Sequence, residues 1–200
     1  MPSFQLWAEP WWVNLLILIP FVTFFAFRKG LALNWRQLMI LAVFATAFGF
    51  VEGAVVVYLR SAIGLLPGYT GTLSELQHSS EGYHQERSLA QFPPSLLSIE
   101  VSREAATIVM LVCVALLTSP LARARWAAFL WTFAIWDSAY YAGLWTIVRW
   151  PASFKDLDIL FLIPVPWIAQ VWFPLLVSML TVAVIALLSG KRSTSPALHP

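Results

Sequence analysis

The sequence contains very little cysteine. Cys113 is the only one among 200 residues, and it lies inside an apolar run. A single cysteine excludes a disulfide within the chain, and it also excludes a cysteine-rich zinc or iron–sulfur site. Any chemistry of this chain therefore depends on other side chains.

Charged residues are also scarce. Lys and Arg number 12 and Asp and Glu 10, so 11% of the chain is charged, whereas a soluble domain carries roughly 25%. Hydrophobic residues make up 60% of the chain, and the mean hydropathy is +0.75. A surface of this composition suits lipid better than water. The net charge of +2 is too small to imply a nucleic-acid partner, and the basic residues are scattered rather than gathered in a patch, so we expect no nucleic acid among the partners.

Long apolar runs dominate what the sequence does contain. A helix needs roughly 20 mostly apolar residues to cross a bilayer. We therefore expect an all-α fold, a polytopic membrane helical bundle of about five transmembrane helices in a single domain, 1–192. The expected spans are about 11–27, 37–59, 95–118, 126–148 and 171–188. An outer loop is expected at 61–94 and a disordered tail at 193–200.

The segment before the last span is interrupted by Pro164 and Pro166. Because proline breaks helices, 159–170 is predicted to be a broken or interfacial segment. Irregular backbone at membrane depth needs protein or water to satisfy its hydrogen bonds, so we expect this segment to pack against the helices. In the loop before it, Asp156 and Asp158 either cap this segment or line the entrance of a cavity.

Basic residues indicate the orientation of the bundle. If five helices alternate in direction, one side holds many basic residues and no acid. These residues are Arg28, Lys29, Arg36, Arg123, Arg125, Lys191 and Arg192. Short cytoplasmic loops are rich in Lys and Arg, so we expect the N-terminus outside and the C-terminus in the cytoplasm.

Ionisable side chains inside the expected spans are the most informative feature. Each costs about 2.5–3.5 kcal/mol at the centre of a membrane helix, so each needs a partner or a function. Glu100, Arg103 and Glu104 share one face of the third expected helix, and Glu52 and Asp137 lie at similar depths on the second and fourth. The candidate catalytic residues are Glu52, Glu100, Arg103, Glu104, Asp137, Tyr140 and Tyr141.

Small residues beside Glu52 predict a close helix contact. Ala45, Gly49 and Gly53 form a ridge at intervals of four residues. Such ridges are typical of membrane helices whose backbones approach closely. We therefore expect another helix to pack against this face.

The buried acids outnumber the buried bases. Arg103 can pair bidentately with one carboxylate, and the remaining acids then require protons or a bound cation. Carboxylates with imidazole suit iron, manganese or zinc, and His78 and His84 lie in the outer loop. The candidate metal ligands are Glu52, Glu100, Glu104, Asp137, His78 and His84. Their spacing matches no standard metal motif, so solvent-exposed histidines without a role are the alternative.

Four stretches give the chain a resemblance to a family. They are Phe50-Val51-Glu52-Gly53 through Arg60, Glu100-Val101-Ser102-Arg103-Glu104-Ala105-Ala106-Thr107, Trp136-Asp137-Ser138-Ala139-Tyr140-Tyr141, and Trp150-Pro151 through Trp167. From the second expected helix onward, the chain resembles an uncharacterised family of small bacterial multi-pass membrane proteins. The resemblance implies a location in the bacterial inner (cytoplasmic) membrane, and it implies no activity or catalytic residue.

Three functions are consistent with these features. A membrane enzyme or metal-binding protein would use the acids as ligands or acid–base groups on a lipophilic or externally supplied substrate, and we favour this interpretation. A structural or assembly subunit would use the same groups to hold helices together. A small proton- or cation-coupled transporter would use them as a relay. The expected partners are bilayer lipids, together with other membrane proteins or further copies of the chain.

Overall fold

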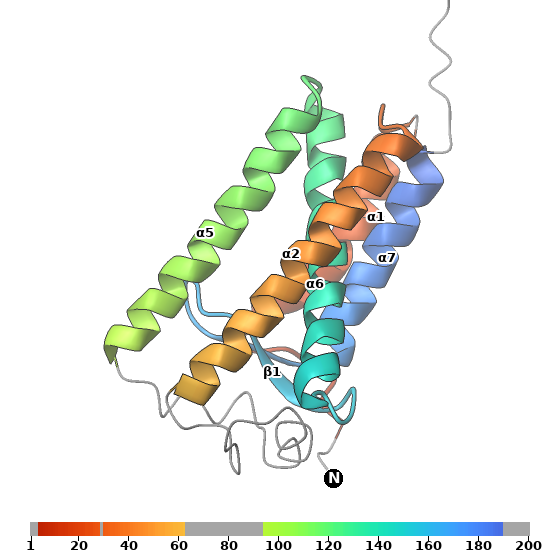
Figure 1. Cartoon of the computed structure of the whole chain (residues 1–200). Helices are drawn as coiled ribbons and strands as arrows, with labels where there is room; N and C mark the ends of the chain where they lie inside the picture. Colours follow the sequence, from red (N-terminus) through yellow and green to blue (C-terminus); the bar gives the residue numbers. More distant parts are fainter. Residues whose placement is uncertain (1–3, 29, 63–93, 190–200) are drawn as a thin grey trace, which may run out of the picture.

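Helices make up most of the computed structural model, which describes residues 4–28, 30–62 and 94–189 (Figure 1). The 3-10 helix η1 (Trp11–Ile17) continues into α1 (Leu18–Phe27), and α2 (Trp35–Ala62), α5 (Pro94–Thr118), α6 (Ala122–Val148) and α7 (Trp172–Ser189) follow. Between α6 and α7 lie the short strands β1 (Leu157–Phe161) and β2 (Trp167–Gln170).

The helices coincide closely with the expected spans. Three of them, α2, α5 and α7, are long and apolar enough to cross a membrane. Helix α6 is also long, but it carries Arg123, Arg125 and Asp137, and the apolar helix Trp11–Phe27 is shorter. The helical bundle is therefore confirmed, while the number of spans and their orientation stay predictions. Most of the expected loop at 61–94 and all of the expected tail at 193–200 lie outside the described residues.

The expectation of an all-α fold is wrong for one segment. Residues 159–170 contribute to an antiparallel hairpin in which Leu157 pairs with Gln170. Pro164 and Pro166 fall in the turn between the strands, where the missing N–H of proline interrupts no pairing. Pairing between the two strands satisfies backbone groups that the prolines prevent from forming a helix.

The N-terminal segment lies along the free edge of β2. The Glu9 N–H donates to the Ile168 carbonyl at 2.8 Å, and the Ile168 N–H donates to the Glu9 carbonyl at 2.7 Å. The Gln5 N–H donates to the side-chain oxygen of Gln170 at 3.0 Å, across 165 residues of sequence. The beginning of the described chain is thereby fixed to the hairpin.

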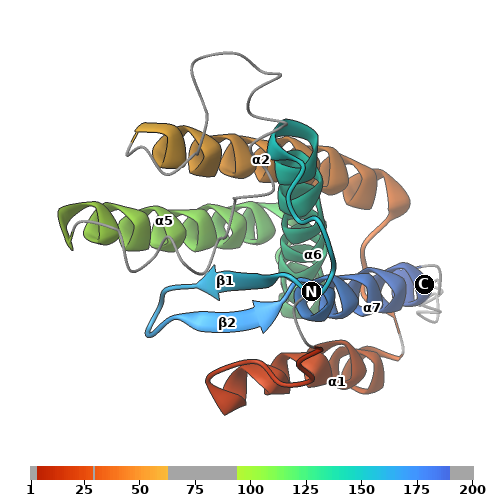
Figure 2. The same ribbon diagram turned by 90° about the horizontal axis from the view of Figure 1, so that it is seen from below.

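Helix α6 lies at the centre of the bundle and packs against α2, α5 and α7 (Figure 2). Its core face is built largely from small side chains, and Ala124, Ala127 and Ala128 are fully buried. Side chains from the neighbouring helices, including Leu38 and Ile185, complete the same apolar cluster. Small residues on a central helix allow several neighbours to approach it closely.

The small-residue ridge on α2 faces α6. A Cβ atom at Gly49 would clash with the carbonyl oxygen of Trp136 and would lie 2.8 Å from the Cβ of Ala139. At Gly53, the nearest atom would be the carbonyl oxygen of Tyr140 at 3.3 Å. The expected close contact is confirmed, and these two glycines set the separation of α2 and α6.

Replacing Gly49 with alanine should lower the free energy of unfolding by about 1–3 kcal/mol, because the new methyl group must push α2 away from α6. Gly143→Ala is the matched control, since the atom nearest to its Cβ would be a ring carbon of Phe50 at 3.4 Å, an ordinary van der Waals contact. Unfolding followed by circular dichroism in detergent compares the two variants. Equal stabilities would contradict a close α2–α6 contact at Gly49.

Candidate functional site

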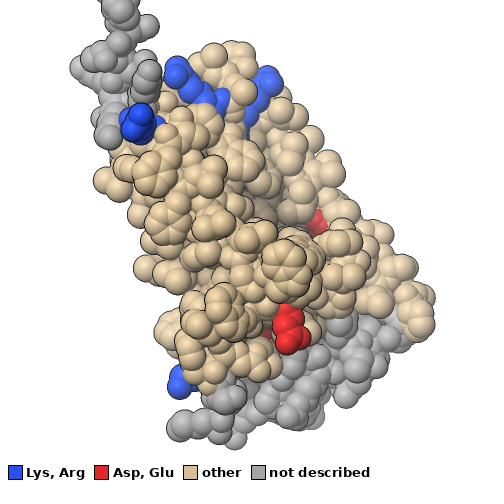
Figure 3. All heavy atoms as spheres, turned by 180° about the vertical axis from the view of Figure 1, so that it is seen from behind, with Lys and Arg blue, Asp and Glu red and all other residues tan. Residues whose placement is uncertain are grey.

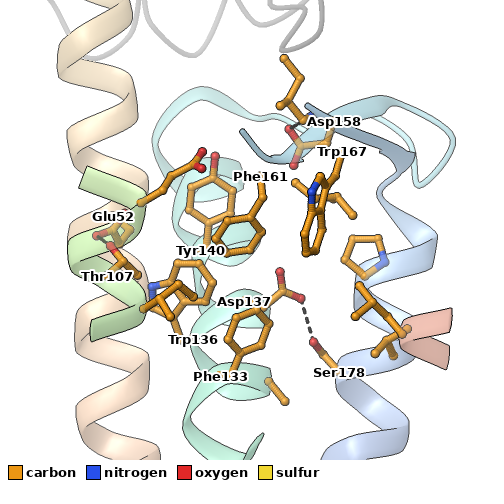
Figure 4. A pocket seen from close by; sticks show the side chains of 18 of the residues that line it. Glu52, Thr107, Phe133, Trp136, Asp137, Tyr140, Asp158, Phe161, Trp167 and Ser178 are labelled. Atoms are coloured by element: carbon orange, nitrogen blue, oxygen red, sulfur yellow. Dashed lines mark hydrogen bonds between the residues drawn. The ribbon is translucent and has the colours of Figure 1, made fainter. Parts of the chain in front are cut away.

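A cavity of about 620 Å³ lies next to the hairpin, and every helix of the described structure contributes to its wall (Figure 4). Its volume falls within the range of roughly 300–1,000 Å³ that is typical of ligand pockets. The residues predicted to form a catalytic site all line it: Glu52, Glu100, Arg103, Glu104, Asp137, Tyr140 and Tyr141. The structure therefore brings these side chains around one space, while their catalytic role stays a prediction.

Arg103 connects α5 to α2. Its Nε and Nη2 atoms donate to the two carboxylate oxygens of Glu100 at 3.1 and 2.7 Å, and its Nη1 atom forms an ion pair with Glu52. The hydroxyl of Thr107 donates to the other oxygen of Glu52 at 2.7 Å. The bidentate pairing of Arg103 with one carboxylate is thus confirmed, and each of its three guanidinium nitrogens has a carboxylate partner.

Glu104 connects α5 to the hairpin. Its Oε2 atom accepts a hydrogen bond from the backbone N–H of Leu162 at 2.8 Å, directly after the end of β1. A backbone N–H buried at this position would otherwise lack a partner, which is costly. Glu104 therefore positions the hairpin beside the cavity.

Asp137 on α6 lies in the cavity wall between Phe133 and Trp167 (Figure 4). The hydroxyl of Ser178 on α7 donates to its Oδ2 atom at 2.8 Å. No ion pair involves Asp137 within the described part of the chain. Although Asp137 lies deep in the bundle, its side chain is only half-buried, because it faces the cavity.

Asp158 on β1 pairs with Tyr141 on α6. The tyrosine hydroxyl donates to Oδ2 of Asp158 at 2.6 Å, and the Ile159 N–H donates to Oδ1 at 2.8 Å. Asp158 is only 1% exposed. Burial away from water raises the pKa of Asp158 to about 7, and the hydrogen bonds from Tyr141 and Ile159 oppose that rise.

The two loop acids have different roles. Asp156 accepts hydrogen bonds from the N–H groups of Ala152 and Ser153 at 2.8 and 3.0 Å, and so stabilises the turn before β1. Asp158 lines the cavity, which was one of the two alternatives. Asp156 does not cap the following segment, because the N–H groups that it accepts from precede it in the chain.

Arg60 is a cavity residue that sequence reasoning missed. It is 7% exposed and lines the cavity together with Glu52 and Val56. These three residues recur at intervals of four along α2, which places them on one helix face. That spacing is the signal in the sequence that could have identified Arg60 as a cavity residue.

Aromatic rings form much of the remaining wall. The ring of Phe133 lies 5.3 Å from Trp136 and 6.1 Å from Phe161, and Phe161 lies 5.4 Å from Trp167. The indole N–H groups of Trp136 and Trp167 are buried and have no hydrogen-bond partner among the described residues. The cavity thus combines apolar rings with polar atoms at defined positions.

The expected metal site receives no support from the structure. Within residues 4–28, 30–62 and 94–189, no three His, Cys, Asp or Glu side chains come close enough together to hold a metal ion. The acids line the same cavity but are held apart, since Glu52, Glu104 and Asp137 each bond to a different element. His78 and His84 lie outside the described residues.

Comparison with known proteins gives no relative of the chain. No family model, no curated protein and no solved structure matches it. The function is therefore argued from the cavity and the surface of the bundle.

Replacing Arg103 with glutamine should lower the free energy of unfolding by about 3 kcal/mol, because Glu52 and Glu100 would lose their shared countercharge. Arg36→Gln is the control, since Arg36 is exposed and should change stability by less than about 0.5 kcal/mol. Titration with a denaturing detergent measures the free energy of unfolding of both variants. Similar effects of the two substitutions would contradict a structural role for the Arg103 ion pairs.

Asp158→Asn should change how stability depends on pH. The pKa of Asp158 is about 7 in the folded protein, against an ordinary value of 3.8, so the folded state binds more protons than the unfolded state between these values. Wild-type stability should therefore fall as the pH rises from about 4 to 7, and the variant should lack this component. Thermal unfolding of the wild type and the variant at several pH values measures this difference in pH dependence. A wild-type-minus-variant difference that does not vary with pH would contradict the assignment.

Proposed function

We propose that this chain is an integral membrane protein whose cavity binds a lipophilic or amphiphilic small molecule. The observation that carries the proposal is the cavity of about 620 Å³, which joins an aromatic wall to ionisable side chains. Ligand pockets are mostly apolar, with a few polar groups that fix orientation. The apolar part of the ligand packs against rings such as Phe133 and Phe161, and its polar part lies near the acids and arginines.

The surface of the bundle supports a location in lipid. Large apolar side chains stand exposed on the three long apolar helices, with Val43 68% exposed on α2, Leu117 87% on α5 and Met179 68% on α7. Soluble monomers rarely expose large contiguous apolar patches. In the hydrocarbon core of a bilayer, these apolar side chains would contact lipid instead of water.

The distribution of charge supports the proposed orientation. Most of the basic side chains seen in Figure 3 gather at one end of the molecule, one lies near the other end, and the acidic side chains in this view lie between the two ends. Arg28 and Arg36 flank the α1–α2 connection, and Arg123 and Arg125 open α6 at the same end. By the positive-inside rule, we propose that this end faces the cytoplasm of a bacterial cell and that the hairpin lies on the outer side.

A binding cavity distinguishes this proposal from a purely structural role. A subunit that used the acids only to hold helices together would gain nothing from an open space of this volume. A membrane enzyme that acts on the bound molecule would use the same cavity, because Tyr140, Tyr141 and the acids line it. The assembly-subunit and transporter alternatives stay predictions.

Photoaffinity labelling tests the cavity directly. A long-chain alcohol that carries a diazirine should label peptides from α6 and the hairpin, and excess unlabelled alcohol should abolish the labelling. Ala105 is exposed on α5 and lines the cavity rim, so Ala105→Trp should reduce the specific labelling at least fivefold. Mass spectrometry of the cross-linked peptides gives the measurement.

Ala106→Trp is the matched control. Ala106 is equally exposed on α5 but does not line the cavity, so the variant should label as the wild type does. Labelling that cannot be competed, or that falls equally in both variants, would contradict a ligand site in this cavity.

A further inference from the structure

We infer that the ligand of this cavity is a lipophilic organic cation, with Asp137 as its countercharge. The inference rests on the proposed function and names the chemical class of the ligand. It follows from the contacts of Asp137, the charge balance of the cavity and the aromatic rings around it.

Asp137 has an incomplete set of partners. Its Oδ2 atom accepts the hydrogen bond from Ser178 at 2.8 Å, and its Oδ1 atom accepts none within the described part of the chain. Figure 4 shows the carboxylate pointing into the open space bounded by Phe133, Phe161 and Trp167. A carboxylate removed from water either binds a proton or pairs with a positive charge, and a bound cation would supply that charge at Asp137.

The charge balance of the cavity favours a cation over an anion. The described lining contains five acids, Glu52, Glu100, Glu104, Asp137 and Asp158, against two arginines, Arg60 and Arg103. Arg103 is already paired with two carboxylates, Glu52 and Glu100, so its positive charge is balanced within the protein. A bound anion would add to the excess of acids, whereas a bound cation reduces it.

The aromatic wall suits an organic cation. Phe133, Trp136, Phe161 and Trp167 form a continuous group of rings, with neighbouring centroids 5.3–6.3 Å apart. The face of an aromatic ring attracts a cation by roughly 0.5–2 kcal/mol, and the attraction is larger where water is absent. The buried indole N–H of Trp136, which has no partner among the described residues, offers a hydrogen bond to an acceptor atom elsewhere on the same ligand.

Two ions of the same shape and opposite charge test the inference. Tetraphenylphosphonium and tetraphenylborate are both large and lipophilic, so their binding to the purified protein differs mainly through charge. The wild type should bind tetraphenylphosphonium at least tenfold more tightly than tetraphenylborate in equilibrium dialysis. Asp137→Asn should weaken the binding of tetraphenylphosphonium at least tenfold and leave that of tetraphenylborate unchanged or tighter.

Glu9→Gln is the control for a general loss of negative charge. Glu9 is an exposed acid that does not line the cavity, so its replacement should leave both affinities unchanged. The comparison of the two ions on the wild type requires no variant, and it therefore tests the inference even if Asp137→Asn does not fold. Equal reductions in Asp137→Asn and Glu9→Gln would overturn the role of Asp137.

The two proposals fail in different ways. Saturable labelling by the neutral photoactivatable alcohol, with equal affinities for the two ions, would overturn the cationic ligand and leave the binding cavity in place. Absence of saturable binding by all three probes would overturn the binding function and the cationic ligand together.

Discussion

Ionised side chains removed from water need partners, and in this bundle the partners come from other elements of the fold. Arg103 on α5 bridges to Glu52 on α2, and Glu104 on the same helix holds the backbone of Leu162 beside the hairpin. The apolar packing of α5 is mainly against α6. The polar contacts therefore fix α5 relative to α2 and the hairpin, and they hold open the space between these elements.

The volume of that space has a physical meaning of its own. Protein interiors are packed as tightly as organic crystals, and the voids in them seldom exceed the size of a water molecule. A cavity of about 620 Å³ is far larger than a packing defect. Its rings and separated acids remain apart because the hairpin, α5 and α7 are each anchored at their own contacts, so the wall does not depend on a bound molecule for its shape.

The helices and the set of cavity residues could be predicted from the sequence, since both depend on local pattern. Apolar run length predicted α2, α5 and α7, and the spacing of Glu100, Arg103 and Glu104 predicted one polar face. The hairpin could not be predicted in the same way. Leu157 and Gln170 pair across a proline-containing turn, and the periodicity of the sequence does not show which two segments pair. The metal hypothesis was unsupported for a related reason: helix depth shows that acids lie at one level, but not that their carboxylates converge.

The contacts of the N-terminal segment also constrain the order in which the chain can assemble. Glu9 pairs with Ile168, and Gln5 bonds to Gln170 across 165 residues. During synthesis these early residues leave the ribosome long before their partners exist. Contacts so distant in sequence form late because a long loop must first be closed. The segment before η1 can consequently take its final place only after the hairpin has formed.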